Sequence, residues 1–156
     1  MQNENAKFKV GVFGFIFNNK NEVLLCHRKD YDLWNPPGGG LKKGELLWEG
    51  VIREVKEETG LDITIERLSG IYSNSQDNSI VFSFKCRIIG GNVSLNDEAD
   101  RIEYFAIEKL PKHISPKQVE RIKDILNNQK ECIMKVQDGP SSVKLFNLKK
   151  LKKSNK

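Results

Sequence analysis

The chain has 156 residues, of which 38% are hydrophobic and 30% are charged. These proportions are typical of one folded domain with a well-solvated surface, and they exclude a disordered or fibrous chain. The sequence has no apolar run near the roughly 18 residues of a membrane span, and its start, MQNENAKFKV, lacks the apolar core of a secretory signal. We therefore expect a cytoplasmic protein with no membrane partner.

The net charge of +5 comes from the end of the chain. Residues 144–156 hold six lysines and no acidic residue, so the remainder of the chain is close to neutral. A lysine-rich terminus is usually a solvated tail and only sometimes a contact to the phosphates of a nucleic acid. We therefore predict a folded domain over residues 1–143 and a basic tail over 144–156.

The first part of the chain indicates strands, a specialised loop and a helix. Apolar runs at 8–17 and 22–26 flank a turn-like segment, which predicts a β-hairpin. Residues 30–40 contain two prolines and three successive glycines, which favour a loop over a helix or a central strand. A helical pattern then covers 45–59, and Gly60 is suited to end that helix.

The second part indicates further strands and a second helix. Strand-like stretches lie at about 62–74, 79–89 and 101–107. Ser115 and Pro116 are typical of the N-cap and first residue of a helix, and an apolar stripe follows them. Apolar runs at 132–136 and 143–148 predict a terminal hairpin. This order of elements indicates a mixed fold of the α/β or α+β class.

Three acidic side chains share one stripe of the helix expected over 45–59. At 100° per residue, Glu54, Glu57 and Glu58 fall within about 100° of one another. Like charges at this spacing destabilise a helix, and a divalent cation would offset their repulsion. Carboxylate oxygens without histidine or cysteine suit a hard ion such as Mg²⁺ or Mn²⁺. From the helix alone, an ordinary solvated acidic face is the alternative.

Glycines surround this acidic stripe. Gly38–Gly40 would let the backbone approach a bound ion, so that carbonyls complete its shell and N–H groups face phosphate oxygens. A simple tight turn is the alternative for these glycines. Gly50 lies on the stripe itself, where a missing side chain would leave room above a metal. The sector expected to pack against the core comprises Trp48, Val51, Ile52 and Val55.

Residues 39–61, GGLKKGELLWEGVIREVKEETGL, resemble the Nudix box, the signature of the Nudix (MutT-like) hydrolases. The pattern of that box is Gly, five residues, Glu, seven residues, Arg-Glu, an aliphatic residue, one residue, Glu-Glu, one residue, Gly and an aliphatic residue. The positions that meet it are Gly39, Glu45, Arg53, Glu54, Val55, Glu57, Glu58, Gly60 and Leu61. The resemblance extends over roughly residues 8–128 and leaves the basic tail outside.

The resemblance implies an α/β/α sandwich around a mixed β-sheet. It also implies hydrolysis of a nucleoside diphosphate linked to another group, with Mg²⁺ or Mn²⁺ as cofactor. In similar boxes the acids at the positions of Glu54, Glu57 and Glu58 bind the metal, and the backbone carbonyl of Gly38 would be a further ligand. Residues 1–143 would then be a Nudix hydrolase domain.

The resemblance assigns further roles outside the metal ligands. Arg53 and Glu45 in similar boxes pair with each other and hold the loop and the helix together. Relatives take their general base from a box glutamate or from an acid on a later loop, so Glu57 and Glu98 are both candidates, with a plain surface charge as the alternative for Glu98. Arg28 is suited to bind a substrate phosphate, or is simply solvated.

The sequence therefore predicts a Mg²⁺-dependent Nudix hydrolase that cleaves the diphosphate linkage of a small nucleotide. The substrate would be a nucleoside diphosphate sugar such as ADP-ribose, or a modified nucleoside triphosphate. One alternative is pyrophosphate removal from the 5′ end of RNA, with the lysine tail holding the RNA backbone. Another is a Nudix-fold module that senses nucleotides without cleaving them. Many relatives are dimers, so the resemblance allows a homodimer.

Overall fold

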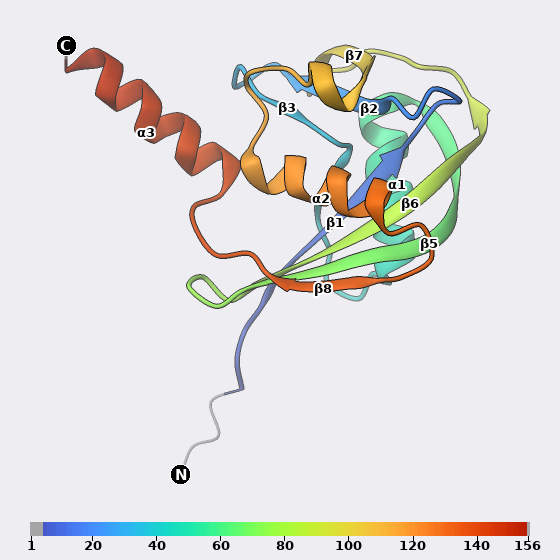
Figure 1. The fold of residues 1–156 in the computed structure, drawn as a ribbon, viewed down its shortest axis with the longest axis horizontal. Coiled ribbons are helices and arrows are strands. Elements are labelled where there is room, and N and C mark those ends of the chain that lie inside the picture. The colour runs from blue at the N-terminus through green and yellow to red at the C-terminus, as the bar shows by residue number, and fades with distance from the viewer. Residues whose placement is uncertain (1–4, 156) are drawn as a thin grey trace.

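Two β-sheets carry the fold in the computed structural model, which describes residues 5–155 (Figure 1). The larger sheet has the strand order β4-β1-β6-β5-β8 and the smaller has β3-β2-β7. The strands are β1 (Lys9–Ile16), β2 (Val23–Arg28), β3 (Trp34–Asn35), β4 (Gly38–Gly40), β5 (Leu61–Asn74), β6 (Ser79–Gly91), β7 (Ala99–Phe105) and β8 (Ile133–Val136). The α-helices are α1 (Leu47–Thr59), α2 (Pro116–Asn127) and α3 (Ser142–Ser154), with a 3-10 helix at Ile107–Lys109.

The larger sheet is mixed in its strand directions. Strand β1 is antiparallel to β4 and parallel to β6, while β5 is antiparallel to β6 and parallel to β8. The strands expected near 62–74, 79–89 and 101–107 are present as β5, β6 and β7. A mixed sheet combined with helices confirms the α/β (α+β) class predicted from the sequence.

Alternate residues of β1 pack against different helices. Val12 belongs to a core cluster with Val51 and Val55 of α1, whereas Phe15 belongs to a second cluster with Ile122 of α2. Successive side chains of a strand point to opposite faces of its sheet. The sheet therefore lies between α1 and α2, which is the expected α/β/α sandwich.

The hairpin predicted from 8–17 and 22–26 is wrong in its pairing, although both strands are present. Strand β1 belongs to the larger sheet and β2 to the smaller one. An isolated bridge between Phe17 and Val23 joins the ends of the two strands. Nearly every residue of β2 is buried, on both faces, so each strand is enclosed between layers rather than half-exposed in a hairpin.

The glycine-rich segment 30–40 contains no helix and no central strand, as expected. Its three glycines form β4 at the edge of the larger sheet, and Trp34–Asn35 forms β3 at the edge of the smaller one. An edge position suits this segment, because proline has no N–H to donate to a neighbouring strand and is tolerated mainly at the edge of a sheet. The edge strand β4 leads directly into the turn before α1.

Helix α1 begins two residues later than the expected start at residue 45, and it ends as expected. Gly60 has a φ of 78°, in the left-handed region, and its N–H donates to the carbonyl of Lys56 at 3.0 Å. Glycine enters this region without the steric cost that a β-carbon imposes. Gly60 therefore ends α1, as the sequence predicted.

Only part of the predicted apolar sector of α1 is packed. Val51 and Val55 are fully buried, but Trp48 is 52% exposed and Ile52 is 39% exposed. The two valines pack over Gly14 of β1, where a β-carbon would lie 2.8 Å from Val55 Cγ2. The contact between α1 and β1 is therefore narrow. Trp48 and Ile52 lie beside it, and the prediction that they pack against the core is wrong.

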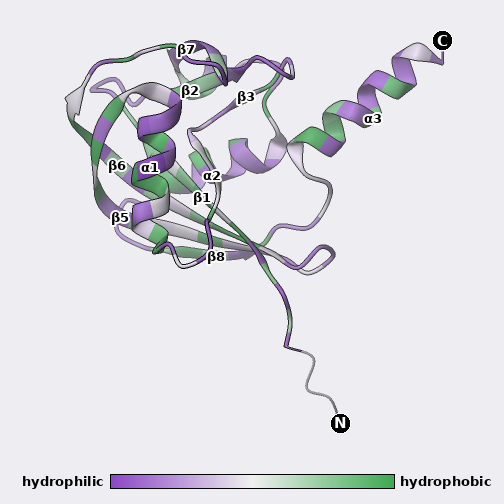
Figure 2. Cartoon of the chain, turned by 180° about the vertical axis from the view of Figure 1, so that it is seen from behind, coloured by the Kyte–Doolittle hydropathy of each residue, from purple (hydrophilic) through white to green (hydrophobic). Residues whose placement is uncertain are grey.

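The hairpin predicted from 132–136 and 143–148 is also wrong. Strand β8 pairs in parallel with β5, and the later run lies within α3. Ser141 caps this helix by accepting the N–H of Lys144 at 3.2 Å, and leucine and lysine both favour helix. Helix α3 extends away from the sheets and mixes hydrophilic with hydrophobic residues (Figures 1 and 2). The domain boundary at 143/144 stays a prediction.

In residues 5–155, no helix has both the length and the apolar character needed to cross a membrane.

Candidate active site

A cavity of about 640 Å³ opens between α1, the ends of β2 and β4, and the loop that follows β6. Glu54 and Glu58 line it from α1, and Glu98 lines it from the loop. Gly38 and Gly39 of β4 line it as well. Segments far apart in the sequence thus bring three carboxylates and two glycines to one concave surface.

The glycines of β4 lie against the carboxylates. The backbone N–H of Gly38 donates to Glu58 Oε2 at 2.8 Å. A β-carbon on Gly39 would lie 2.8 Å from Oε1 of Glu54, closer than real β-carbons come. A glycine at position 39 therefore lets β4 approach Glu54 closely, while the main chain at position 38 bonds Glu58. The proposed metal ligation by the Gly38 carbonyl stays a prediction.

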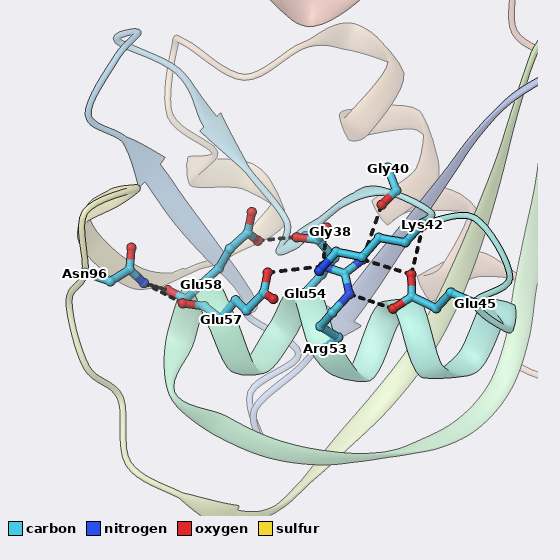
Figure 3. A network of polar contacts seen from close by, with 9 residues as sticks. All are labelled: Gly38, Gly40, Lys42, Glu45, Arg53, Glu54, Glu57, Glu58 and Asn96. Carbon is cyan, nitrogen blue, oxygen red and sulfur yellow. Dashed lines mark hydrogen bonds and ion pairs between the residues drawn. The ribbon is translucent and has the colours of Figure 1, made fainter.

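Arg53 organises the polar network in front of α1 (Figure 3). Its Nε and Nη2 donate to the two oxygens of Glu45 at 2.6 and 3.0 Å. Its Nη1 donates to Glu54 at 3.0 Å and to Glu57 at 3.1 Å, and Nη2 also reaches the carbonyl of Gly40 at 3.3 Å. A planar guanidinium can hold several acceptors in fixed directions. Arg53 therefore joins the loop, the start of α1 and two acids of the stripe.

Asn96 fixes the loop after β6 to the end of α1 (Figure 3). Its side-chain N–H group donates to the carbonyls of Glu57 and Glu58, both at 2.8 Å. Its side-chain oxygen accepts the N–H groups of Glu98 at 2.7 Å and Ala99 at 3.0 Å. The last carbonyls of a helix lack partners within the helix, so this contact satisfies them. Glu98 is thereby held at a set position relative to the acidic stripe.

Asn96 is a functional-site residue that the sequence reasoning missed. Asparagine side chains often bond the backbone two residues further on in turns, which is the contact made to Glu98. That local signal is present in the sequence, in the segment SLNDEAD. The contact to the carbonyls of α1, 38 and 39 residues away, has no such signal.

Burial and mutual repulsion raise the pKa values of two carboxyl groups in the cavity. Burial, with a smaller contribution from the charges of Glu54 and Glu98, raises the pKa of Glu58 to about 8, although the N–H bond from Gly38 opposes the effect. Burial also raises the pKa of Glu54, although its bond with Arg53 opposes the effect. By contrast, the bond from Arg53 lowers the pKa of Glu45 to about 2. The cavity therefore holds two acids that ionise reluctantly unless positive charge is added.

The raised pKa of Glu58 predicts that the metal-free protein loses stability as pH rises. Between the ordinary pKa of 4.5 and the folded value of about 8, the folded state binds more protons than the unfolded state, so the free energy of unfolding falls with rising pH. We expect the melting temperature in EDTA to fall by a few degrees over this range. Circular dichroism melts will measure it.

Glu58→Gln provides the control for this pH dependence, because glutamine does not titrate. Its melting temperature should vary less between pH of about 6 and about 8.5 than that of the wild type. Added Mg²⁺ should raise the melting temperature of the wild-type protein at the higher pH, since the cation favours the ionised carboxylate of Glu58. Identical pH dependence in the two proteins would contradict the account of Glu58.

Two other predicted site residues have definite positions. Arg28 lines the cavity, and its Nε and Nη2 donate to the carboxylate of Asp30 at 2.8 and 2.6 Å. Its role in binding phosphate stays a prediction. The expectation for Gly50 is wrong: a β-carbon there would lie 2.6 Å from Leu41 Cδ1, so Gly50 allows close packing of the loop instead of leaving space above a metal.

Both histidines of the chain contact Asp32 beside the cavity. His27 Nε2 lies 2.9 Å from Asp32 Oδ1, and His113 Nδ1 lies 2.6 Å from Asp32 Oδ2. The Nδ1 atom of His27 lies 2.6 Å from Asp100 Oδ1. The pairs His27–Asp100 and Asp32–His113 are 73 and 81 residues apart, so their contacts could not be predicted from spacing in the sequence. The cluster ties the segment around Asp32 to β2, β7 and the residues before α2.

The carboxylates fit a hard divalent cation by their chemistry. In the described residues, no three His, Cys, Asp or Glu side chains surround one point as a ready metal site. Arg53 holds Glu54 and Glu57, while Glu58 accepts the N–H of Gly38. Oxygen-only ligands are those that Mg²⁺ prefers. The raised pKa of Glu58 is what a carboxylate shows without its neutralising partner.

Comparison with known proteins gives the same family at the level of sequence and fold. A family model described as the NUDIX domain matches residues 7–126. A Bacillus subtilis (strain 168) protein, named provisionally as an 8-oxo-dGTP diphosphatase, is 29% identical over 130 residues, which are 83% of this chain and 87% of that protein. An ADP-ribose pyrophosphatase of Methanocaldococcus jannaschii is 37% identical over 110 residues, 62% of each chain.

Solved structures share the architecture. A NUDIX hydrolase from Nitrosomonas europaea superposes with a TM-score of 0.74 at 21% identity, covering 87% of this chain and 82% of that one. The mixed sheet between α1 and α2 is the architecture that the two chains share. The chain belongs to the Nudix family. It is accordingly an enzyme, a pyrophosphohydrolase, and the alternative of a module that senses nucleotides without cleaving them is set aside.

Proposed function

We propose that this enzyme is a Mg²⁺-dependent hydrolase that cleaves the diphosphate linkage of a small nucleotide. The substrate class is a nucleoside diphosphate sugar such as ADP-ribose, or a modified nucleoside triphosphate. The observation that supports it most is the meeting of Glu54, Glu58 and Glu98 in one cavity beside Gly38 and Gly39. The names of the two sequence relatives support the same range of substrates.

The residues of the cavity divide the work of this reaction. Mg²⁺, when bound, would neutralise the diphosphate charge and activate a water molecule. Glu54, Glu57 and Glu58 would hold the cation, with Mn²⁺ as a substitute. Arg53 keeps two of these acids in place through bonds of 3.0 and 3.1 Å. The glycines of β4 let the substrate approach the acids without a side chain between them.

Glu98 is the better placed of the two candidate bases. It lines the cavity, and Asn96 fixes its backbone. Glu57 is not among the residues that line the cavity, and its side chain contacts Arg53. A base must lie within hydrogen-bond reach of the water whose proton it takes. We therefore assign proton removal to Glu98 and cation binding to Glu57.

Glu98→Gln should lower kcat by about 10² to 10⁴ and leave KM nearly unchanged, because a general base acts on the transition state more than on bound substrate. The acidic limb of the pH–rate profile should disappear with it. Steady-state kinetics over a range of pH will measure both effects. A rise in KM with unchanged kcat would instead make Glu98 a substrate-binding residue.

The side-chain oxygen of Asn35 offers a contact for a nucleotide substrate. Its side-chain oxygen is buried, lies in a residue that lines the cavity, and has no hydrogen-bond partner in the described part of the chain. Buried polar atoms are normally satisfied. An N–H donor on the substrate, such as the amine of a nucleobase, would satisfy this oxygen. The sequence reasoning did not single out Asn35.

A panel of nucleotides tests the proposed function. The purified enzyme is incubated with nucleoside diphosphate sugars, modified nucleoside triphosphates and ordinary nucleoside triphosphates, each with Mg²⁺ or EDTA. Mass spectrometry identifies the products. We expect cleavage within the diphosphate of at least one compound and none in EDTA. An inert protein across the panel would refute the proposal. Dimerisation and the cytoplasmic location stay predictions.

A further inference from the structure

A second concave surface lies between α3 and the body of the protein. We call it the lysine groove; its volume is about 440 Å³. Its cationic lining consists of Lys112, His113, Lys149, Lys150, Lys152 and Lys153. Among the described residues that line it, Asp32 is the one carboxylate, and both its oxygens contact histidines. The groove is therefore positive, and its one carboxylate, which is bonded to histidines, is not free to offset the lysine charges.

Helix α3 has a fixed anchor at its beginning. Phe146 packs edge-on against Tyr31, with ring centroids 5.3 Å apart. Leu145, Leu33 and Ile114 also line the groove near this contact. The four lysines of α3 that line the groove come after this apolar anchor in the chain. Part of the segment expected to be a solvated tail therefore forms one wall of a basic and partly apolar groove.

This composition suits a flexible polyanion that also carries apolar rings. Single-stranded nucleic acids bind grooves in which cationic side chains follow the phosphates and apolar or aromatic side chains contact the bases. The lysine groove has both components in one place. A lipid bilayer is a flat ligand, and it would need the apolar side chains of α3 on its outer face with the lysines beside them. Leu148 and Leu151 of α3 are exposed, at 45% and 60%, but four lysines of α3 line a concavity that a flat bilayer cannot follow.

We propose that the lysine groove binds single-stranded RNA. The hydroxyl-bearing Ser142 lines the groove among the cations, and the 2′-hydroxyl of RNA is a partner that DNA lacks. This binding goes beyond hydrolysis of a small nucleotide and does not require it. The groove and the catalytic cavity share a wall, because Asp32 lines the groove and bonds His27, which lines the cavity.

The test compares a groove variant with a matched surface variant. The groove variant combines Lys112→Gln, Lys149→Gln and Lys153→Gln. The control combines Lys20→Gln, Lys123→Gln and Lys144→Gln, which remove the same charge from exposed positions outside the lining. Fluorescence anisotropy follows a labelled single-stranded RNA of about 12 nucleotides. EDTA in the buffer prevents hydrolysis, so failure of the proposed enzymatic function leaves this binding result unaffected.

We expect the groove variant to bind the RNA at least about tenfold more weakly and the control to stay within about twofold of wild type. The slope of log K against log salt should fall by about 2 in the groove variant, because each phosphate that a lysine neutralises on a single strand adds roughly 0.7 to that slope. Circular dichroism will show that both variants keep their helix content. Retained tight binding by the groove variant would overturn the proposal.

Further arms separate other polyanions from RNA. Equal weakening in both variants would mean that net charge, and not the groove, binds RNA. Tighter binding of single-stranded DNA or of a duplex of the same sequence would also overturn the proposal. Co-sedimentation with vesicles of about 30% phosphatidylserine in phosphatidylcholine tests the membrane alternative. Vesicle binding that depends on the groove lysines, without RNA binding, would assign the surface to lipid instead.

Discussion

Glu57→Gln should lower kcat by several orders of magnitude and leave the fold intact. The side chain is 47% exposed and contacts Arg53 through a bond of 3.1 Å that glutamine can still accept. Stability therefore changes little, as for most surface substitutions. The amide oxygen is a much weaker ligand for a divalent cation than a carboxylate, so the cation is lost or misplaced. Turnover of the best substrate from the panel, measured across a Mg²⁺ titration, will show both effects.

Glu49→Gln is the matched control for this substitution. Glu49 lies on the same helix, is exposed, and accepts the N–H of Leu46 at 3.2 Å, a bond that glutamine preserves. It should keep wild-type turnover and stability. Activity of Glu57→Gln within about threefold of wild type would show that Glu57 does not hold the catalytic cation.

Gly38→Ala should destabilise the protein by about 3 kcal/mol and abolish activity. A β-carbon at Gly38 would overlap the carbonyl oxygen of Val12 and lie 2.7 Å from the α-carbon of Phe13. Both are backbone atoms of the central strand β1, so the clash can be relieved only by moving β4. That movement would break the bond from Gly38 N–H to Glu58 at 2.8 Å. Chemical denaturation will measure the change in the free energy of unfolding.

The neighbouring glycine provides the control for steric overlap. A β-carbon at Gly40 would have no heavy atom within 4 Å, and its φ is not in the left-handed region. Gly40→Ala should therefore stay within about 0.5 kcal/mol of wild type and retain activity. Equal losses in the two variants would mean that β4 depends on glycine for chain flexibility and not for the approach of β1 and Glu58.

The part of the site that lies within one short segment could be predicted from the sequence. Helical periodicity places Glu54, Glu57 and Glu58 on one stripe, and α1 has that stripe beside the glycine strand. The helix end at Gly60 and the cap at Ser115 follow from local backbone preferences. Such features need only neighbours within a few residues, which the sequence displays directly.

Features that depend on distant partners could not be predicted. The apolar runs of β1 and β2 are compatible with a hairpin, but β1 pairs with β4 and β6 and β2 pairs with β3 and β7, and the spacing of the two runs does not reveal these partners. The contact of Asn96 with the end of α1 and the contacts of Asp32 with His27 and His113 join segments that nothing in their spacing relates.

The C-terminal segment was predicted as a strand but is helical, because a short apolar run fits both structures. Residues 143–148 alternate enough to resemble a strand, but the lysines and leucines that follow favour helix, and Ser141 supplies a cap. A short apolar run cannot distinguish the two without its flanks. The lysine count was visible in the sequence, whereas the concave arrangement of those lysines opposite Lys112 and His113 required the fold.

The carboxamide of Asn96 bridges the end of α1 and the loop that carries Glu98. The proposed proton acceptor and the proposed cation ligands are thereby parts of one mechanical unit. Little of a substrate's binding energy would then be consumed in ordering that loop.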